Sequence, residues 1–511
     1  MRSRKFLIVP VLAAVIAAGF SASARSYKRG VSENNFMLKE EMEVLTPGVC
    51  WFYNWGNTPN SGIADYIGDE TMVFIPMCWN ANYNADNIRN YCKAHPEVKY
   101  LLGFNEPNFV SQANMTPAAA AAAWPQVQAL AKELGLKLVG PAVNYSPDGP
   151  ENDPYTWYAN FVNLVGKDAF DFIAIHNYSG GAGGMKDMID RFYELYGKQI
   201  WVTEFCSWSA DKVTPEMQIA SMIEQLEYLE KSDKVYRYSW FKAKGSTTSH
   251  PCYGLIVPKN GYGERELSEQ GMVYVYMTDF DKTVYHSVDE IVPATEYISS
   301  QSLMLGSNKD SRNPGKLEIT RFNSGAYADY QFEIPSDGEY TLTMRVSGEG
   351  EPTRFDPTLG ISIVDENGEE QEVLVKSSSF TLSGKDEEFA PVQFKLNLKA
   401  GKQIIRVKDA SPYMPSGLHI SCLSFNDELA GVSVLPVTEV EFDCKSVDGQ
   451  LCFTSSEEVA NCEVYSLNGA LVFAGTVSNN AVSVPNLNAG LYIVKAGTVA
   501  GKTVTAKVVV Y

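Results

Sequence analysis

The chain has 511 residues, which exceeds the size at which one hydrophobic core stops growing, so we expect several domains. Hydrophobic residues make up 45% and charged residues 20%, a balance that excludes a largely disordered chain. The formal net charge is −19, and no basic stretch offsets it, which argues against nucleic acid as a partner. The five His residues are scattered and no HExxH or CxxC motif is present, so the sequence predicts no metal site and implies no cofactor.

Residues 1–24 are typical of a secretory signal peptide. A basic start at Arg2–Lys5 precedes the apolar run Phe6–Phe20, and Ala22–Ala24 fits the small-residue cleavage pattern. The run is shorter than the about 18 residues that a membrane-spanning helix needs. We therefore expect an exported protein, secreted or at the cell surface, with no integral membrane segment in the mature chain.

The next segment, residues 25–45, is polar and charged, and we interpret it as a linker. From 46 to 283, short apolar runs alternate with helical patterns, in one of which Thr116 is a plausible N-cap and Pro117 a first-turn residue. The apolar runs are Cys50–Asn54, Met72–Met77, Tyr100–Phe104, Lys137–Val143, Asp171–Ile175, Gln199–Thr203 and Tyr236–Trp240.

Near-continuous apolar strands that alternate with helices indicate a parallel sheet covered on both faces. The length and rhythm favour a (β/α)8 barrel, with an open doubly wound sheet as the alternative. Only seven strands are evident, and we expect the eighth to be short or irregular and to lie within residues 60–71.

The pattern changes beyond residue 285. Residues 288–428 contain alternating runs between turn residues, which indicates an antiparallel β-sandwich. Residues 436–511 are expected to form a smaller all-β domain, in which Asn468-Gly469 predicts a hairpin turn.

Polar and aromatic side chains follow the predicted barrel strands, where catalytic groups of parallel barrels lie. Two of them are carboxylates, Glu106 and Glu204, each directly after an apolar strand. Glycoside hydrolysis needs two carboxyl groups that flank the scissile bond. A single such Glu is often only the start of the next helix, whereas a pair among amides and aromatics indicates catalysis. The predicted substrate contacts are Asn54, Trp55, Trp79, Asn105, Asn144, His176, Tyr178 and Trp240. Trp240, Trp55 and Trp79 each fit either a sugar platform or an aromatic residue of the core. His176 fits a structural role as well as a substrate contact.

The segments Trp51–Trp55, Ile75–Trp79, Gly103–Asn108 and Trp201–Phe205 together resemble glycoside hydrolase family 128. The resemblance covers about residues 46–280. It implies a (β/α)8 barrel and a retaining β-1,3-glucanase, with Glu106 as the acid/base and Glu204 as the nucleophile. It also implies that Asn105 contacts the sugar 2-hydroxyl. By its strand-end position, Tyr178 could hydrogen-bond the nucleophile.

Two further resemblances concern the β-rich regions. Ala294–Tyr297, Tyr327–Phe332 and Leu398–Arg406 are similar to carbohydrate-binding module family 6, which implies a sandwich that binds glycan. Val464–Gly469 and Leu487–Lys495 resemble the type A sorting domain of the type IX secretion system, which implies secretion machinery as a partner.

The sequence thus predicts an exported endo-β-1,3-glucanase whose partner is a neutral β-glucan. One alternative is an enzyme of the same clan that acts on another β-glycan. The other is a catalytically silent surface protein that binds glycan and keeps the barrel as a scaffold.

Overall fold

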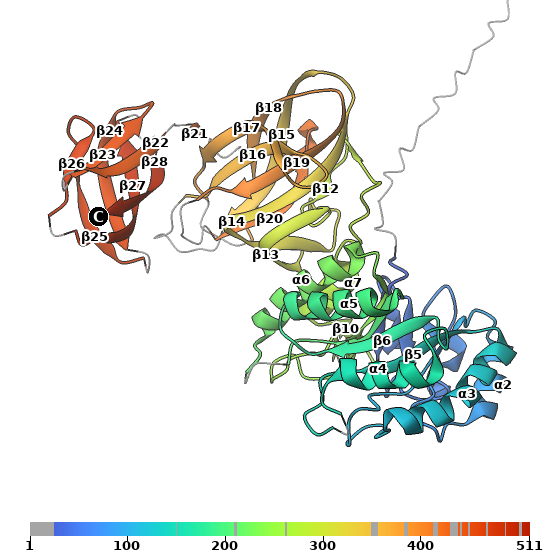
Figure 1. The fold of residues 1–511 in the computed structure, drawn as a ribbon. Coiled ribbons are helices and arrows are strands. Elements are labelled where there is room, and N and C mark those ends of the chain that lie inside the picture. Colours follow the sequence, from blue (N-terminus) through green and yellow to red (C-terminus); the bar gives the residue numbers. More distant parts are fainter. Residues whose placement is uncertain are drawn as a thin grey trace, which may run out of the picture.

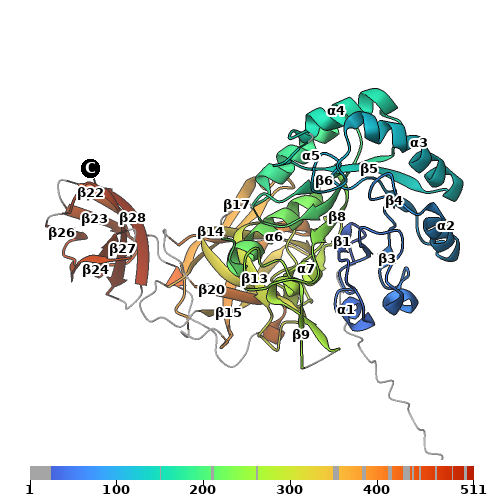
Figure 2. The same cartoon turned by 90° about the horizontal axis from the view of Figure 1, so that it is seen from below.

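The computed structural model describes residues 25–149, 151–208, 212–260, 263–348, 356–382, 387–411, 417–429, 438–439, 442–447, 450–466, 469–485, 487–499 and 503–510. The predicted signal peptide and Asn468 of the predicted hairpin turn lie outside these residues. Figures 1 and 2 show the β-sandwich between the barrel and the C-terminal β-domain.

The first region is an eight-stranded parallel sheet in the order β3-β2-β1-β8-β7-β6-β5-β4. A parallel bridge between Met77 and Leu102 joins its two ends, so the sheet closes into the predicted barrel. The strands are β1 (Arg29–Ser32), β2 (Trp51–Tyr53), β3 (Val73–Phe74), β4 (Tyr100–Leu102), β5 (Lys137–Val143), β6 (Phe172–Asn177), β7 (Ile200–Phe205) and β8 (Val235–Phe241).

Seven of these strands confirm the predicted apolar runs, but the prediction for the eighth is wrong. It is β1, which pairs in parallel with both β2 and β8 and lies inside the segment interpreted as a linker. Residues 61–66 form a 3₁₀ helix instead. The misplacement has a physical reason, since the polar residues of β1 are buried with partners. The guanidinium of Arg29 bonds Glu230 and the carbonyl of Tyr274, and Lys28 donates to the carbonyls of Leu229 and Glu230.

Helices cover the outside of the barrel, as the alternating pattern predicts. They are α1 (Lys39–Glu43), α2 (Ala85–Ala94), α3 (Pro117–Leu134), α4 (Pro154–Val165), α5 (Gly183–Tyr196), α6 (Pro215–Lys231) and α7 (Glu269–Tyr276). The predicted cap of α3 is confirmed, because the Thr116 hydroxyl accepts a hydrogen bond from the amide of Ala119 and Pro117 begins the helix. None of the described helices has the length and apolar character needed to span a membrane.

A short antiparallel hairpin precedes α7, and the β-sandwich follows it. The hairpin consists of β9 (Ile256–Pro258) and β10 (Arg265–Leu267). The sandwich strands are β11 (His286–Ser287), β12 (Val292–Pro293), β13 (Ser299–Ser307), β14 (Leu317–Ile334), β15 (Gly338–Gly348), β16 (Thr358–Val364), β17 (Glu370–Ser379), β18 (Ala390–Leu398), β19 (Gly401–Asp409), β20 (Leu418–Ser424) and β21 (Thr438–Glu439). They form one sheet system, in which the described strands pair antiparallel except for β11, which pairs in parallel with β14.

The last region contains a three-stranded and a four-stranded sheet. Its strands are β22 (Phe442–Val447), β23 (Gln450–Ser455), β24 (Val459–Ser466), β25 (Leu471–Thr476), β26 (Ala481–Ser483), β27 (Gly490–Thr498) and β28 (Thr503–Val510). Strands β24 and β25 pair antiparallel, as expected for the predicted hairpin.

Candidate active site

The carboxyl ends of the barrel strands surround a cavity of about 1140 Å³. Both predicted carboxylates, Glu106 and Glu204, line it. The other described residues that line it are Trp55, Trp79, Asn105, Phe109, Gln112, Asn144, Tyr145, Pro147, Tyr155, Asn177, Tyr178, Ser179, Gly184, Asp187, Met188, Trp208 and Phe241. Aromatic rings surrounding two acidic groups suit a ligand with flat apolar faces and polar edges.

Glu204 projects from β7 and is 4% exposed. One of its oxygens, Oε1, accepts hydrogen bonds from the indole nitrogen of Trp55 at 2.8 Å and from the hydroxyl of Tyr53 at 3.1 Å. The other, Oε2, accepts one from the hydroxyl of Tyr178, as the strand-end position of Tyr178 predicts. Three donors on one carboxylate fix its orientation and favour its ionised form.

Glu106 lies on the turn after β4 and is 6% exposed. Its φ of 41° is unusual for a residue with a side chain, and its amide donates to the carbonyl of Ala142 on the neighbouring strand. The strand approaches this turn through Gly103, where an added Cβ would lie 2.8 Å from both Trp124 and the carbonyl oxygen of Val139. The close packing of Gly103 and this hydrogen bond hold the Glu106 side chain at the cavity.

His176 lies between the two carboxylates on β6 and is fully buried. Its Nδ1 is 2.8 Å from Oε1 of Glu106 and 3.3 Å from Oε2 of Glu204. The three groups offer ligand atoms within 4.8 Å of one another, so they could be considered as a metal site. A tetrahedral Zn²⁺ with bonds of about 2.0–2.1 Å would space its ligands more than about 3 Å apart. The 2.8 Å contact between His176 and Glu106 therefore fits a hydrogen bond better than two ligands of one ion.

The buried pair of carboxylates perturbs the neighbouring pKa values. Burial and the charge of Glu106 raise the pKa of Glu204, while His176, Tyr178 and Trp55 oppose that rise. Burial lowers the pKa of His176, but the two carboxylates outweigh burial and the net shift is upward. Burial and the carboxylate of Glu204 raise the pKa of Tyr178, which keeps its hydroxyl a donor. Titratable groups with such opposing influences are common in active sites.

Most of the residues predicted from the sequence meet at this cavity. Trp55, Trp79, Asn105, Asn144 and Tyr178 line it together with the two carboxylates. His176 lies beneath the carboxylates rather than on the cavity wall.

Two predicted substrate contacts are placed elsewhere. Asn54 bonds its own loop, because its side chain donates to the carbonyl of Thr58 and accepts from the amide of Gly56. Trp240 is fully buried; its ring packs on Phe205 and its indole nitrogen donates to the carbonyl of Tyr253. The prediction of Trp240 as a substrate contact is therefore wrong, and its burial fits the alternative of an aromatic residue of the core.

Several lining residues escaped the sequence analysis. Phe241 follows Trp240 directly, so the alternation of side chains along β8 turns it toward the cavity while Trp240 faces the core. Trp208 lies four residues after Glu204 and is 41% exposed, and its ring stacks on Tyr253. Tyr145 lies in the connection between β5 and α4, and Tyr155 lies in the first turn of α4, so neither is at the end of a strand.

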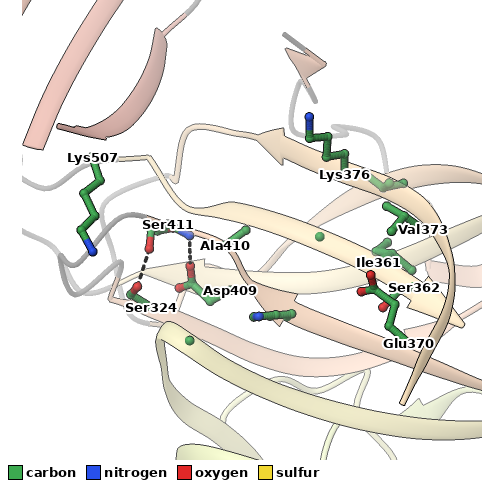
Figure 3. A pocket seen from close by; sticks show the side chains of 14 residues that line it. Ser324, Ile361, Ser362, Glu370, Val373, Lys376, Asp409, Ala410, Ser411 and Lys507 are labelled. Atoms are coloured by element: carbon green, nitrogen blue, oxygen red, sulfur yellow. Dashed lines mark hydrogen bonds between the residues drawn. The ribbon is translucent and has the colours of Figure 1, made fainter. Parts of the chain in front are cut away.

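A second cavity, of about 650 Å³, lies on the sandwich strands β16, β17 and β19. Figure 3 shows its side chains, including Ser324, Ser362, Lys376, Asp409 and, from the C-terminal domain, Lys507. No aromatic side chain occurs among the described residues that line it. It therefore lacks the stacking platform found in the barrel cavity.

Two family models match the chain. Residues 30–274 match the glycosyl hydrolase catalytic core, and residues 447–511 match the secretion system C-terminal sorting domain. The first match begins within β1, in agreement with the place of this strand in the barrel. No curated protein matches the chain.

Several solved structures are similar to the barrel. An endo-β-1,3-glucanase of glycoside hydrolase family 128, subgroup II, from Pseudomonas viridiflava is 35% identical over 49% of this chain and 97% of that chain, with a TM-score of 0.44. A subgroup II endo-β-1,3-glucanase from Sorangium cellulosum is 34% identical over 48% of this chain and 97% of that chain, with a TM-score of 0.43. A subgroup I endo-β-1,3-glucanase from Amycolatopsis mediterranei, solved in complex with laminaritriose, is 28% identical over 49% of this chain and 98% of that chain, with a TM-score of 0.38.

The family assignment rests on sequence identity across the whole barrel. The first two relatives are 35% and 34% identical over 97% of their own length, and the region concerned contains both carboxylates of the cavity. The chain therefore belongs to glycoside hydrolase family 128.

Proposed function

We propose that this glycoside hydrolase is a secreted, retaining endo-β-1,3-glucanase with Glu204 as nucleophile and Glu106 as acid/base. The observation that carries the proposal is the carboxylate pair at the strand ends of the barrel, in which one oxygen of Glu106 and one oxygen of Glu204 lie no more than 4.8 Å apart. Retaining enzymes hold their carboxyl groups about 5–5.5 Å apart, whereas inverting enzymes leave about 6.5–9.5 Å for a water molecule. The close spacing favours direct attack by one carboxylate.

The reaction would proceed in two displacements. In the first, an oxygen of Glu204 attacks the anomeric carbon, the glycosidic bond breaks, and Glu106 gives its proton to the departing sugar oxygen. In the second, Glu106 takes a proton from water, the water oxygen attacks the anomeric carbon, and Glu204 is released. The hydrogen bonds to Glu204 from Trp55, Tyr53 and Tyr178 support the nucleophile role, since they orient the carboxylate. Those from Trp55 and Tyr178 also oppose the rise in its pKa that burial and Glu106 cause.

The substrate class is supported by the cavity and by the relatives. The cavity combines aromatic rings with amides such as Asn105 and Asn144, which fit the faces and hydroxyl groups of neutral sugars. The relatives at 35% and 34% identity are endo-β-1,3-glucanases, and the third was solved with laminaritriose. We extend endo action on β-1,3-glucan to this chain on that basis.

The C-terminal sorting domain indicates secretion, to the medium or the cell surface. We propose that residues 1–24 direct the first export step and that the type IX machinery recognises the sorting domain. We keep glycan binding by the sandwich as a separate prediction, to be tested by retention on insoluble β-glucan.

Reducing-sugar release from a panel of β-glucans tests the proposal. We expect hydrolysis of β-1,3-glucan to a series of oligosaccharides, with the β-anomer formed first. Release of glucose alone would indicate exo action, and preference for another linkage would indicate the other β-glycan alternative. Glycan binding without release of sugar would favour the silent surface protein.

A further inference from the structure

His176 contacts the proposed acid/base through one oxygen only. Its Nδ1 is 2.8 Å from Oε1 of Glu106, and no hydrogen bond to Oε2 of Glu106 occurs among the residues that the structure describes. Because Glu106 lines the cavity and His176 is fully buried, Oε2 is the oxygen left to face a substrate.

The surroundings of His176 place a proton on its Nδ1. Nδ1 faces two carboxylates, those of Glu106 and Glu204, while buried Nε2 has no hydrogen-bond partner in the described part of the chain. A nitrogen next to two acceptors carries a proton both in the neutral ring and in the imidazolium, which the raised pKa of His176 favours. The hydroxyl groups of Tyr53 and Tyr178 donate to Glu204, so neither of them donates a hydrogen bond to Nδ1.

We propose that His176 is a positioning residue, which donates its Nδ1 proton to Oε1 of Glu106 and thereby confines the transferable proton of that carboxyl group to Oε2. An oxygen that already accepts a hydrogen bond from His176 is a poor site for a second proton. The proton of Glu106 is then held at the cavity, where it can reach the glycosidic oxygen. After transfer, the same hydrogen bond stabilises the carboxylate that forms.

This inference rests on the proposed function. It differs from the sequence prediction of a substrate contact, because His176 would act through Glu106 and not touch the sugar. General acid catalysis contributes about 10²–10⁴-fold and matters most for poor leaving groups. The loss of His176 should therefore affect natural glucan strongly and an activated aryl glycoside weakly.

The test compares His176→Phe, which keeps a ring but removes both nitrogens, with His176→Asn, whose amide can donate near the position of Nδ1. We expect His176→Phe to lower kcat/KM on a β-1,3-glucan oligosaccharide by about 10²-fold and on 2,4-dinitrophenyl β-laminaribioside by less than about fivefold. His176→Asn should recover at least about tenfold of the loss on the oligosaccharide. His419→Phe, at a buried histidine of the sandwich, is the matched control and should leave both rates unchanged.

The pH profile provides a second readout. His176 opposes the upward shift of the pKa of Glu204, so its removal should move the acidic limb of kcat/KM to higher pH. Equal losses on both substrates with unchanged melting temperature, or no recovery in His176→Asn, would overturn the positioning role. Failure of the unaltered enzyme to cleave any β-1,3-glucan would instead overturn the proposed function.

Discussion

At the residue scale, the two buried carboxylates differ in their partners. Glu204 accepts three hydrogen bonds from Trp55, Tyr53 and Tyr178, whereas Glu106 has its hydrogen-bond contact with His176 on one oxygen. The donors orient Glu204 for attack, while the oxygen of Glu106 that His176 does not contact can carry a proton to a substrate in the cavity. The geometry thus supports different tasks for chemically identical groups.

Different tasks predict different responses to azide. Glu106→Ala should still form the glycosyl-enzyme from a dinitrophenyl glycoside, because that leaving group needs no proton. Its slow hydrolysis should accelerate in azide, a nucleophile that needs no base, and the product should be the β-glycosyl azide. The measurement is release of dinitrophenol with and without azide, with NMR of the product. An α-glycosyl azide, or rescue of Glu204→Ala to a β-product, would reverse the two assignments.

The tryptophans give a second contrast at this scale. Trp208→Ala should lower kcat/KM on β-1,3-glucan about two- to tenfold without changing the melting temperature, because an exposed aromatic contact contributes about 0.5–1.5 kcal/mol and Trp208 is 41% exposed. Trp240→Ala should instead lower the free energy of unfolding by about 3–5 kcal/mol, since this ring is fully buried. Kinetics and chemical denaturation of both variants check the pair. Reversed effects would mean that Trp240, and not Trp208, contacts the substrate.

At the element scale, the sequence predicted seven strands because each was an apolar run, and it misplaced the eighth because β1 is not one. Arg29–Ser32 contains a single large apolar residue, Val31, and is preceded by Lys28. A buried arginine is tolerated only where its partners are supplied, and here they come from α6, β8 and α7, some 200 residues away. Periodicity along the chain cannot reveal partners at that distance. The same limit explains why Phe241 was missed while its neighbour Trp240 was chosen.

The buried pair of Arg29 and Glu230 predicts a large effect of one substitution. Arg29→Met should lower the free energy of unfolding by about 3–5 kcal/mol, because it leaves Glu230 buried without its partner. The measurement is urea denaturation, with Lys39→Met as the matched control at the exposed pair of Lys39 and Glu43. The control should change stability by less than about 0.5 kcal/mol. An equally small effect at Arg29 would mean that β1 is not an integral strand of the barrel.

At the scale of the whole molecule, one hydrophobic cluster runs from the barrel into the sandwich, a second fills the barrel interior, and the C-terminal domain has its own. The sandwich strand β13 lies against α6 and α7. Glu227 of α6 accepts hydrogen bonds from the amide and hydroxyl of Ser300, and Glu269 of α7 does the same for Ser307. The contacts predict that the barrel and sandwich unfold together.

Truncations test this arrangement. A chain that ends near Asn426 should keep its activity on soluble glucan and the melting temperature of the barrel, because the sorting domain has a separate core. A chain that ends near residue 287 should melt at a lower temperature, since the faces of α6 and α7 against β13 lose their cover. Calorimetry and soluble-glucan assays of both chains provide the comparison. Equal melting temperatures would mean that the sandwich is an independent module that acts only on insoluble substrate.

The contact region between barrel and sandwich also predicts a pH dependence. Glu296 lies between β12 and β13, and burial together with the charge of Asp279, just after α7, raises its pKa to about 7. A carboxyl whose pKa is higher in the folded state than in the unfolded state binds an extra proton when folded, so stability falls as pH rises. The fall should extend from about pH 4.5 to somewhat above pH 7 and amount to at most about 3 kcal/mol.

Glu296→Gln removes this titration, so it should match the parent protein at pH 4.5 and melt at a higher temperature at pH 8. The measurement is the melting temperature of barrel and sandwich at half-unit pH steps in constant ionic strength. Glu339→Gln, at an exposed carboxylate paired with Lys395, is the control and should follow the parent at every pH. If the plots of melting temperature against pH for Glu296→Gln and the parent stay parallel, a group other than Glu296 causes the loss of stability at high pH. If the two curves converge only at low pH, the contact region between barrel and sandwich loses stability because Glu296 ionises.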